Sequence, residues 1–376
     1  MTSAPAGIGR AGDHAPLAAG IDIGAIVTRH AEEAGFSGVC CVVRDGQELY
    51  HEAFGLAHRG FAVPNRLTTR FDIASVTKVF TAVATVQCIE RGDFSLDTPL
   101  VPYLGLEGTA IPATVSVFHA LTHTSGIADD ADEEAGEDYA DLFRDSPNYR
   151  IRETADFLPN FAFKQPNFPP GEGVRYNNCA FVLLGLAIER ATGMPYREVV
   201  RERVFTPAGM TGSDFLAMDL AAPDFAEHYT RIDDAPDGSE RWQKNIYAYP
   251  PIGSPDGGAT VPARDLVRFI DALRDGVLTG DAGRDLLLRP HVDVAAPTER
   301  DPFRRMCGFA FEFLLDGEGA IVAMQKDGVN AGVSSFLVHY PQTDTTVAIL
   351  ANQECNVWAM QRELRDLLAF PDAGPA

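Results

Sequence analysis

The chain has 376 residues, of which 45% are hydrophobic and 22% are charged, as is ordinary for a globular protein. This length predicts two domains or one core with a large insertion, and no stretch approaches the roughly 18 apolar residues that a membrane span needs. The formal charge of −22 repels phosphate backbones and anionic lipid, so we expect neither a nucleic-acid partner nor a membrane partner.

The two ends of the chain predict little structure. Residues 1–18 are rich in Ala, Gly and Pro without periodicity and predict a flexible arm, and residues 371–376 predict a short tail. The N-terminus lacks a basic segment followed by an apolar one, so we expect no signal peptide and a cytoplasmic location. Six thinly spread cysteines then predict free buried thiols instead of disulfides. They are Cys40, Cys41, Cys88, Cys179, Cys307 and Cys355.

The first strong pattern is a β-hairpin over residues 37–54, with an apolar run and a turn at Asp45-Gly46. Helices follow. Residues 75–91 place apolar side chains at helical spacing, with Gly92 just past the end. The same reasoning predicts helices over residues 178–191 and 265–275.

Strand signals return near the C-terminus, before a last helix over residues 355–368. The predicted strands are residues 309–315, 320–326, 334–340 and 346–351. These patterns predict an α/β (α+β) fold in which one antiparallel sheet is built from both chain ends, flanked by helices, with a mainly helical region inserted. In domain terms, residues 19–74 and 245–370 form the α/β sheet domain, and residues 75–244 form the mainly helical domain.

Lysine is rare in this chain. There are only four, Lys78, Lys164, Lys244 and Lys326, and the remaining basic residues are arginines. An arginine cannot lose its proton in a protein, whereas a desolvated lysine can, so a retained lysine is a candidate base. Ser75 and Lys78 in Ser75-Val76-Thr77-Lys78 project to one face of the predicted helix, which places a hydroxyl beside an amine. Taken alone, the tetrapeptide favours a different interpretation, in which Ser75 is a helix cap and Lys78 is a solvated residue.

Two further segments accompany this tetrapeptide. Tyr176-Asn177-Asn178 begins the next strongly periodic helix, and supplies a phenol that can relay a proton and an amide that can orient a base or a carbonyl. Lys326-Asp327-Gly328 ends a strand, where glycine lets the backbone approach a ligand closely.

These segments, in this order, resemble the serine β-lactamase and penicillin-binding protein family, and in particular its class C β-lactamase, D-peptidase and family VIII carboxylesterase branch. SVTK corresponds to its S-x-x-K motif, YNN to Y-x-N and KDG to K-T-G or H-x-G. Further segments are similar to sequences of that family: LTHTSGI at residues 121–127, PPGEG before YNN, PAGM at 207–210 and GVSSF at 332–336. The resemblance covers residues 20–370, and implies the β-lactamase/transpeptidase-like fold.

The resemblance also implies a role for each matched residue. Ser75 is then the acylated nucleophile, and Lys78 with Tyr176 forms the general base and proton relay. Asn178 binds a substrate oxygen, and Lys326, Asp327 and Gly328 line the substrate side of the cleft. The backbone N–H groups of Ser75 and Val329 form the oxyanion hole, which is typically worth roughly a few kcal/mol in the transition state.

One position departs from the family pattern. Asp327 stands where penicillin-binding members carry a hydroxyl that meets the carboxylate of penicillins and peptide C-termini. Two carboxylates a few ångströms apart repel by roughly a few kcal/mol at an effective dielectric constant of about 20. We therefore expect β-lactams and free C-terminal peptides to be poor substrates, and neutral or amine-bearing esters and amides to be preferred. The alternative is that Asp327 turns away and pairs with an arginine.

The expected function is a serine hydrolase that forms an acyl-enzyme on a small-molecule ester or amide, with acyl transfer as a variant. A β-lactamase, and a silent binding protein that keeps the fold, remain alternatives. We expect no cofactor and no metal, because His119 and His123 are spaced like zinc ligands but enclose Ala120 where a metalloprotease carries Glu. The acidic segment 129–138 is expected to be a solvated loop, or else to border the cleft and steer cationic or neutral substrates.

Overall fold

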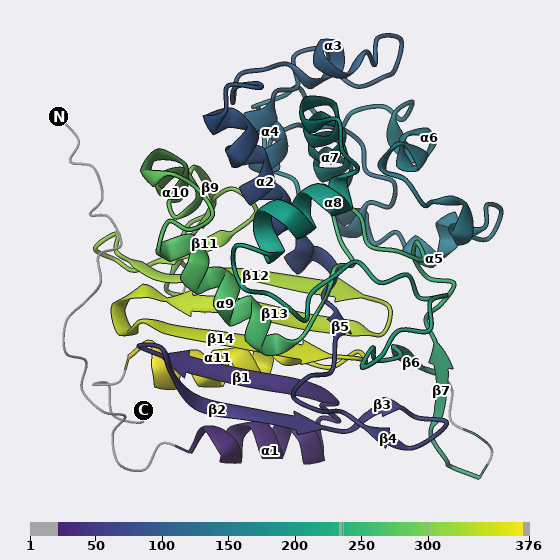
Figure 1. Cartoon of the computed structure of the whole chain (residues 1–376), viewed down its shortest axis with the longest axis vertical. Helices are drawn as coiled ribbons and strands as arrows, with labels where there is room; N and C mark the ends of the chain where they lie inside the picture. The colour runs from purple at the N-terminus through teal and green to yellow at the C-terminus, as the bar shows by residue number, and fades with distance from the viewer. Residues whose placement is uncertain (1–21, 233–234, 236, 299–300, 371–376) are drawn as a thin grey trace.

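The computed structural model describes residues 22–232, 235, 237–298 and 301–370, so the expected arm and tail lie outside the described residues. Its centre is an eight-stranded sheet in which every pair of neighbouring strands is antiparallel (Figure 1). In spatial order the strands are β2 (Gln47–Phe54), β1 (Gly38–Arg44), β14 (Thr345–Ala351), β13 (Val333–Tyr340), β12 (Ile321–Asn330), β11 (Glu312–Leu315), β10 (Arg304–Cys307) and β9 (Val292–Ala295). Strand β1 pairs with β14, so strands from the two ends of the chain are neighbours in the sheet.

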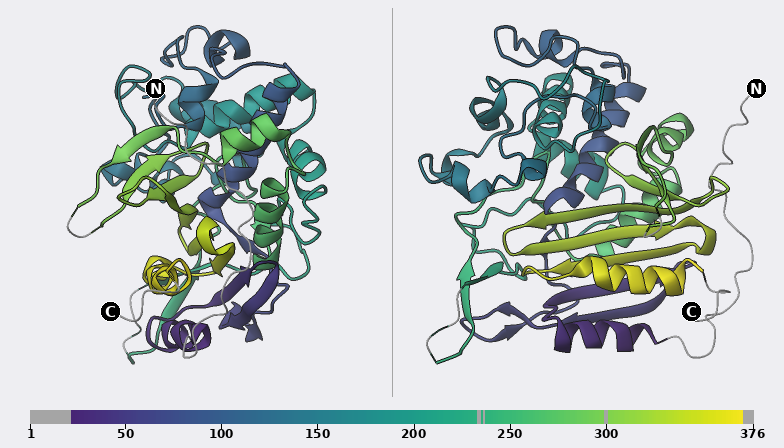
Figure 2. Two further views of the ribbon diagram at one scale, coloured as in Figure 1. Left: turned by 90° about the vertical axis from the view of Figure 1, so that its left-hand side faces the viewer. Right: turned by 180° about the vertical axis from the view of Figure 1, so that it is seen from behind.

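Helices cover both faces of this sheet (Figure 2). The side chains of β1 alternate between the faces: Cys40 and Val42 pack with α1 (Ile23–Glu33) and α11 (Val357–Leu368), and Cys41 packs in the larger core on the opposite side. Every residue of β1, β13 and β14 is buried, which explains their nearly continuous apolar sequences. On the second face lie α9 (Ala263–Arg274) and, next to α2, α10 (Asp281–Leu287).

A mainly helical region is inserted between β5 and β6, and lies over one part of the sheet (Figure 1). Its α-helices are α2 (Lys78–Glu90), α3 (Leu100–Leu104), α4 (Val117–Leu121), α5 (Tyr139–Leu142), α6 (Leu158–Phe161), α7 (Cys179–Thr192) and α8 (Tyr196–Val200). Helices α2 and α7 pack against each other and are buried along most of their length, which makes them the centre of this region. Helix α7 ends at Gly193, which has a φ of 69° and adopts the left-handed conformation common after a helix.

Three short two-stranded ladders lie outside the eight-stranded sheet. They are β3 (Leu56–His58) with β4 (Val63–Pro64), β5 (Phe71–Asp72) with β8 (Thr260–Val261), and β6 (Tyr229–Ile232) with β7 (Arg241–Lys244). The β5–β8 ladder pairs Asp72 with Thr260 and leads directly into the turn that carries Ser75. Two segments far apart in the sequence therefore fix where α2 begins.

The α/β fold class is confirmed, and the sheet is indeed built from both ends of the chain. Helix α1 and the outer strands β9 and β10 are among the elements that were not predicted. The expected strand 309–315 is shorter, because Ala310 has a φ of 65° and regular strand geometry begins only at Glu312. The division into two domains stays a prediction.

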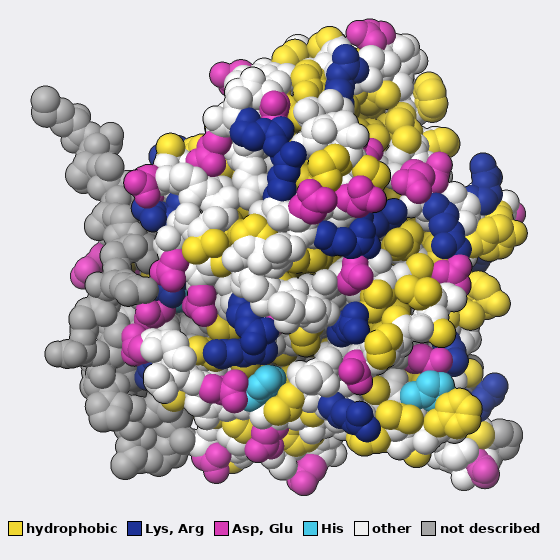
Figure 3. Space-filling view, in the orientation of Figure 1, with side chains coloured by type: hydrophobic (Ala, Val, Ile, Leu, Met, Phe, Trp, Pro, Cys, Tyr) yellow, Lys and Arg dark blue, Asp and Glu magenta, His cyan; other side chains and the backbone are white. Residues whose placement is uncertain are grey.

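The six cysteines are free thiols, and all but the half-buried Cys355 are buried. Among the described residues, no helix is both long and apolar enough to cross a membrane. On the face shown in Figure 3, basic and acidic side chains are interspersed, so this face carries no continuous basic surface of the kind that binds a phosphate backbone.

Candidate active site

Ser75 lies in a tight 3₁₀ turn, η1 (Ala74–Thr77), between β5 and α2. The α-helix itself begins at Lys78, so the expectation that Ser75 is the start of a regular helix is wrong by one turn. The reason is local: Ala74 has a φ of 43°, and the amide of Val76 bonds back to the carbonyl of Ile73. Ser75 is half-buried, so its hydroxyl remains accessible next to the first residue of the helix.

The amine of Lys78 is completely buried, yet it is surrounded by acceptors. Its Nζ lies 3.0 Å from Ser75 Oγ and 2.6 Å from Asn178 Oδ1, and it also donates to the backbone carbonyl of Asp256. Burial lowers the pKa of Lys78 to about 8, against the opposing charge of Asp256 and with the help of the charge of Lys326. The lowered pKa increases the share of the amine that is neutral near pH 7 and able to accept a proton.

Tyr176 approaches the same hydroxyl from the other side. Its phenol donates to Ser75 Oγ at 2.6 Å, and its ring lies between two amines, with Lys78 Nζ and Lys326 Nζ each 5.0 Å from the ring centroid. The ring of His123 packs beside it at 4.7 Å. Burial, together with the charge of Glu133, holds the pKa of Tyr176 well above its usual value, so the phenol keeps its proton at neutral pH.

Asn178 is the residue just before α7, and its side chain is already engaged. Oδ1 accepts from Lys78, while Nδ2 donates to Glu133 Oε1 at 3.0 Å and to the hydroxyl of Tyr139. The Asn178 backbone N–H donates to Asp129 Oδ2 at 2.8 Å. In this arrangement the amide oxygen accepts from the amine of Lys78. Asn178 also lines the first cavity, and its expected binding of a substrate oxygen stays a prediction.

The acidic segment 129–138 is not simply a solvated loop. Asp129 and Asp130 are buried, because the Asp129 carboxylate accepts from the first backbone amides of α7 and so caps that helix. Asp132 forms a bidentate ion pair with Arg175 at 2.7 Å. Glu133 is exposed and borders the cleft beside Ser75. The position of this segment therefore agrees with the alternative expectation, that it borders the cleft.

The third motif lies on β12, along the opposite wall. Lys326 Nζ is 3.1 Å from Asp327 Oδ1, and Trp358 Nε1 donates to Asp327 Oδ2 at 3.1 Å. The Asp327 carboxylate therefore pairs with Lys326 and not with an arginine, and it lines the cleft with its side chain 43% exposed. The charge of Lys326 and the Trp358 bond outweigh burial and keep its pKa below the usual value.

Gly328 brings this strand against the serine turn. A Cβ on Gly328 would lie 2.2 Å from the carbonyl oxygen of Ile73 and 3.1 Å from the amide nitrogen of Ser75, so only glycine fits without displacing the backbone. The next residue, Val329, is 48% exposed and lines the cleft. The structure therefore brings the Ser75 amide and the backbone after Gly328 to the same place.

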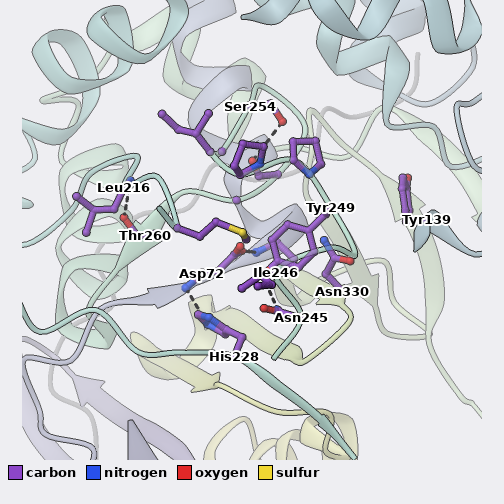
Figure 4. A pocket seen from close by; sticks show the side chains of 18 of the residues that line it. Asp72, Tyr139, Leu216, His228, Asn245, Ile246, Tyr249, Ser254, Thr260 and Asn330 are labelled. Carbon is purple, nitrogen blue, oxygen red and sulfur yellow. Dashed lines mark hydrogen bonds between the residues drawn. The ribbon is translucent and has the colours of Figure 1, made fainter. Parts of the chain in front are cut away.

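Two cavities meet at Ser75. The first, of about 450 Å³, has an apolar wall to which Leu216 and Ile246 contribute (Figure 4). Asn178 also lines this cavity. The second, of about 350 Å³, contains Tyr176, Lys326 and Asp327. Among the residues that line these cavities, Ser75, Glu133 and Val329 belong to both. A substrate bound at Ser75 can therefore extend in two directions.

Sequence reasoning brought the three motifs together but missed several of their partners. Asp256, Asp129 and Trp358 had not been singled out individually, because each lies on a loop or near a helix start without a recognisable motif. His119 and His123 do not act as a ligand pair. His119 contributes to the N-terminal cap of α4, while buried His123 accepts from the amide of Asn177.

Comparison with known proteins agrees with this geometry. The family model described as Beta-lactamase matches residues 23–369. The chain belongs to the beta-lactamase family. It is 33% identical to esterase EstB of Burkholderia gladioli over 284 residues, 70% of this chain and 71% of that protein. It is 27% identical to penicillin-binding protein 4* of Bacillus subtilis over 86% of this chain and 69% of that protein.

A solved structure gives the same result in three dimensions. The penicillin-binding protein from Bacillus halodurans superposes with a TM-score of 0.83 at 34% identity, covering 92% of this chain and all of that one. Membership of the beta-lactamase family makes this chain a serine hydrolase, and the expected fold is confirmed. The roles of individual side chains are not decided by these similarities.

The pKa of Lys78 can be measured directly, because the chain has only four lysines. In a sample labelled with ¹³C at lysine Cε, we expect one resonance to titrate with a midpoint near pH 8, since burial disfavours the ammonium form. Loss of that resonance in Lys78→Arg assigns it. A Lys78 resonance that keeps the chemical shift of a charged amine up to pH 10 would show that burial does not lower the pKa of this amine.

Proposed function

We propose that this protein hydrolyses small esters or amides through an acyl-enzyme on Ser75. One observation carries the proposal: a single accessible hydroxyl lies within hydrogen-bond distance of both a buried amine and a phenol, Lys78 at 3.0 Å and Tyr176 at 2.6 Å. Such an arrangement provides a nucleophile with a base and an acid already in place. The similarity to an esterase, EstB, supports the choice of reaction.

The pKa of Lys78 is lowered and that of Tyr176 is raised, so the two partners of the Ser75 hydroxyl can take different roles in proton transfer. Neutral Lys78 accepts the Ser75 proton while Oγ attacks the substrate carbonyl, because the phenol of Tyr176 is still protonated at neutral pH. The amides of Ser75 and Val329 form the oxyanion hole for the tetrahedral intermediate. When the intermediate collapses, Tyr176 donates its proton to the leaving oxygen or nitrogen, and Lys78 reprotonates the phenol. Water then attacks the acyl-enzyme by the same relay in reverse.

The positions of these groups indicate which part of the substrate each cavity holds. Tyr176 lines only the second cavity, so the leaving group that it protonates lies there, next to Lys326 and Asp327. The acyl group then occupies the first cavity, where Leu216 and Ile246 contribute to an apolar wall. A volume of about 450 Å³ suits a medium-sized apolar or aromatic acyl group.

Charge at the junction of the cavities favours neutral or amine-bearing substrates. Asp327 lies on the leaving-group side and Glu133 borders both cavities, so a substrate carboxylate would meet two negative groups, of which Lys326 offsets one. This charge argues against the alternative of an efficient β-lactamase. The complete set of Ser75, Lys78 and Tyr176 argues against a silent binding protein.

Small-molecule substrates also agree with the strongly acidic composition, which disfavours nucleic acid and anionic membranes as partners. A cytoplasmic location remains part of the proposal and rests on the sequence alone.

Ser75→Ala should abolish both labelling by a fluorophosphonate and turnover of p-nitrophenyl esters, because it removes the attacking oxygen. Lys78→Arg keeps the positive charge but cannot act as a base, so its rate should fall by at least about a hundredfold. Intact mass spectrometry measures labelling, and a panel of esters, D- and L-aminoacyl amides and a chromogenic cephalosporin measures turnover. Labelling of the alanine variant at the wild-type rate would refute the assignment.

Asp327→Thr should raise the rate on a chromogenic cephalosporin relative to that on a neutral ester, because it removes the charge that repels the cephalosporin carboxylate. The measurement is the ratio of the two kcat/KM values. Asp366→Thr, on the exposed side of α11, changes the net charge equally and should leave the ratio unmoved. Efficient cephalosporin hydrolysis by the wild type, or an unchanged ratio in Asp327→Thr, would exclude this role.

Glu133→Gln should weaken turnover of an aminoacyl ester relative to the same ester without its amine. The expected change in kcat/KM is about threefold to fivefold, the size of a solvent-exposed ion pair. Glu137→Gln serves as the matched control, because Glu137 belongs to the same acidic segment but does not line either cavity. Equal effects of the two substitutions would show that only the net charge of the segment matters.

A further inference from the structure

The residue before the nucleophile holds a conformation that costs free energy. Ala74 has a φ of 43°, in the left-handed region that residues with a Cβ rarely adopt, and it is buried next to the first cavity. Such a backbone persists only where the surroundings over-determine it. Because Ser75 follows directly, the direction of its Oγ toward Lys78 and Tyr176 depends on this one peptide.

Several backbone contacts hold the peptides around Ala74. The amide of Ile73 bonds to the carbonyl of Ala259 at 3.0 Å, and the amide of Gly258 bonds to the carbonyl of Ala74 at 3.2 Å. The amide of Ala74 itself has a side-chain acceptor: Asp72 Oδ1 at 2.7 Å. Unlike the backbone bonds, this bond to the strained residue can be removed by the substitution of a side chain.

Asp72 is held in turn by a buried polar cluster at the wall of the first cavity (Figure 4). Its carboxylate is hydrogen-bonded by the hydroxyl of Tyr249, and that hydroxyl accepts from Asn245 Nδ2 at 2.6 Å. The backbone N–H of Asp72 donates to Nε2 of the buried His228 at 3.2 Å. A carboxylate that is only 6% exposed is expensive to bury, and the Tyr249 hydroxyl and the Ala74 amide offset part of that cost by donating to it.

We propose that Asp72 is a positioning residue, which fixes the strained turn at Ala74 and so directs the hydroxyl of Ser75 at Lys78 and Tyr176. This proposal rests on the proposed role of Ser75 as nucleophile. Asp72 does not touch the reacting atoms, and it acts through the backbone that precedes the nucleophile. What it must supply is an acceptor at one point in space, and a negative charge is not essential for that.

The distinction between an acceptor and a charge gives the test. Asp72→Asn retains an acceptor for the Ala74 amide and should keep kcat within about threefold of the wild type, whereas Asp72→Ala should lower kcat about tenfold to a hundredfold, the cost of a misplaced reacting group. KM for a p-nitrophenyl ester should stay within about twofold in both variants, because the cavity walls remain. The rate of fluorophosphonate labelling at Ser75 should follow kcat.

A second substitution tests the strain itself. Glycine adopts a positive φ without a steric penalty, so Ala74→Gly should recover more activity in the Asp72→Ala background than in the wild type. Tyr249→Phe removes the other bond to the carboxylate while keeping the ring, and its kcat should fall between those of the wild type and Asp72→Ala. If Asp72→Ala does not fold, the kcat of Tyr249→Phe provides the test in its place.

Asp265→Ala is the matched control for burial. Asp265 is fully buried and accepts from the amide of Gly212 at 2.9 Å, but lies outside both cavities. We expect it to lower the Tm without changing the labelling rate of the folded protein. Wild-type labelling in Asp72→Ala, an Asp72→Asn variant as slow as Asp72→Ala, or equal effects of Ala74→Gly in both backgrounds would overturn the role of Asp72. Failure of the wild type to label at Ser75 would overturn the proposed function as well.

Discussion

The whole site depends on the burial of one amine. Lys78 is inaccessible to solvent, and moving an ammonium group out of water costs far more than a neutral amine does. The fold meets this cost in two ways: it offers hydrogen-bond acceptors from Ser75, Asn178 and the backbone of Asp256, and it lowers the proton affinity of the amine. These acceptors come from three separate parts of the chain, so the base exists only once the inserted helical region has packed onto the sheet.

Burial shifts the pKa values of the two groups beside Ser75 in opposite directions, and so suits one group to accept a proton and the other to donate one. It lowers the pKa of the cationic acid Lys78 and raises that of the neutral acid Tyr176, because in each case it disfavours the charged form. One environment therefore produces a proton acceptor and a proton donor on either side of one hydroxyl. Lys326 places a second positive charge near the phenol, with its Nζ 5.0 Å from the centroid of the Tyr176 ring.

Apolar patterns were sufficient to predict the central strands and the long helices, because β1, β13, β14 and most of α7 are buried and their sequences are rich in apolar residues. Strands β9 and β10 are short and largely exposed, so they left no such pattern. The motifs predicted that Ser75, Lys78 and Tyr176 lie together, and the hydrogen bonds of Ser75 to the other two agree with this. The acids around them were not predicted, since a residue such as Asp256 meets Lys78 only through tertiary contacts across 178 positions of sequence.

The acidic surroundings of Lys78 have a chemical consequence of their own. Asp256, Glu133 and Asp129 each raise the pKa of the amine, against burial and the charge of Lys326. Without them the amine would be neutral at a lower pH, but it would also be a weaker base, and general-base catalysis is most effective when the pKa lies near the working pH. The three acids therefore limit the fall of the Lys78 pKa, and burial keeps this pKa below that of a solvated lysine. Asp256 and Glu133 also line the first cavity, so two of the acids that raise the pKa of Lys78 also contribute negative charge to the cleft.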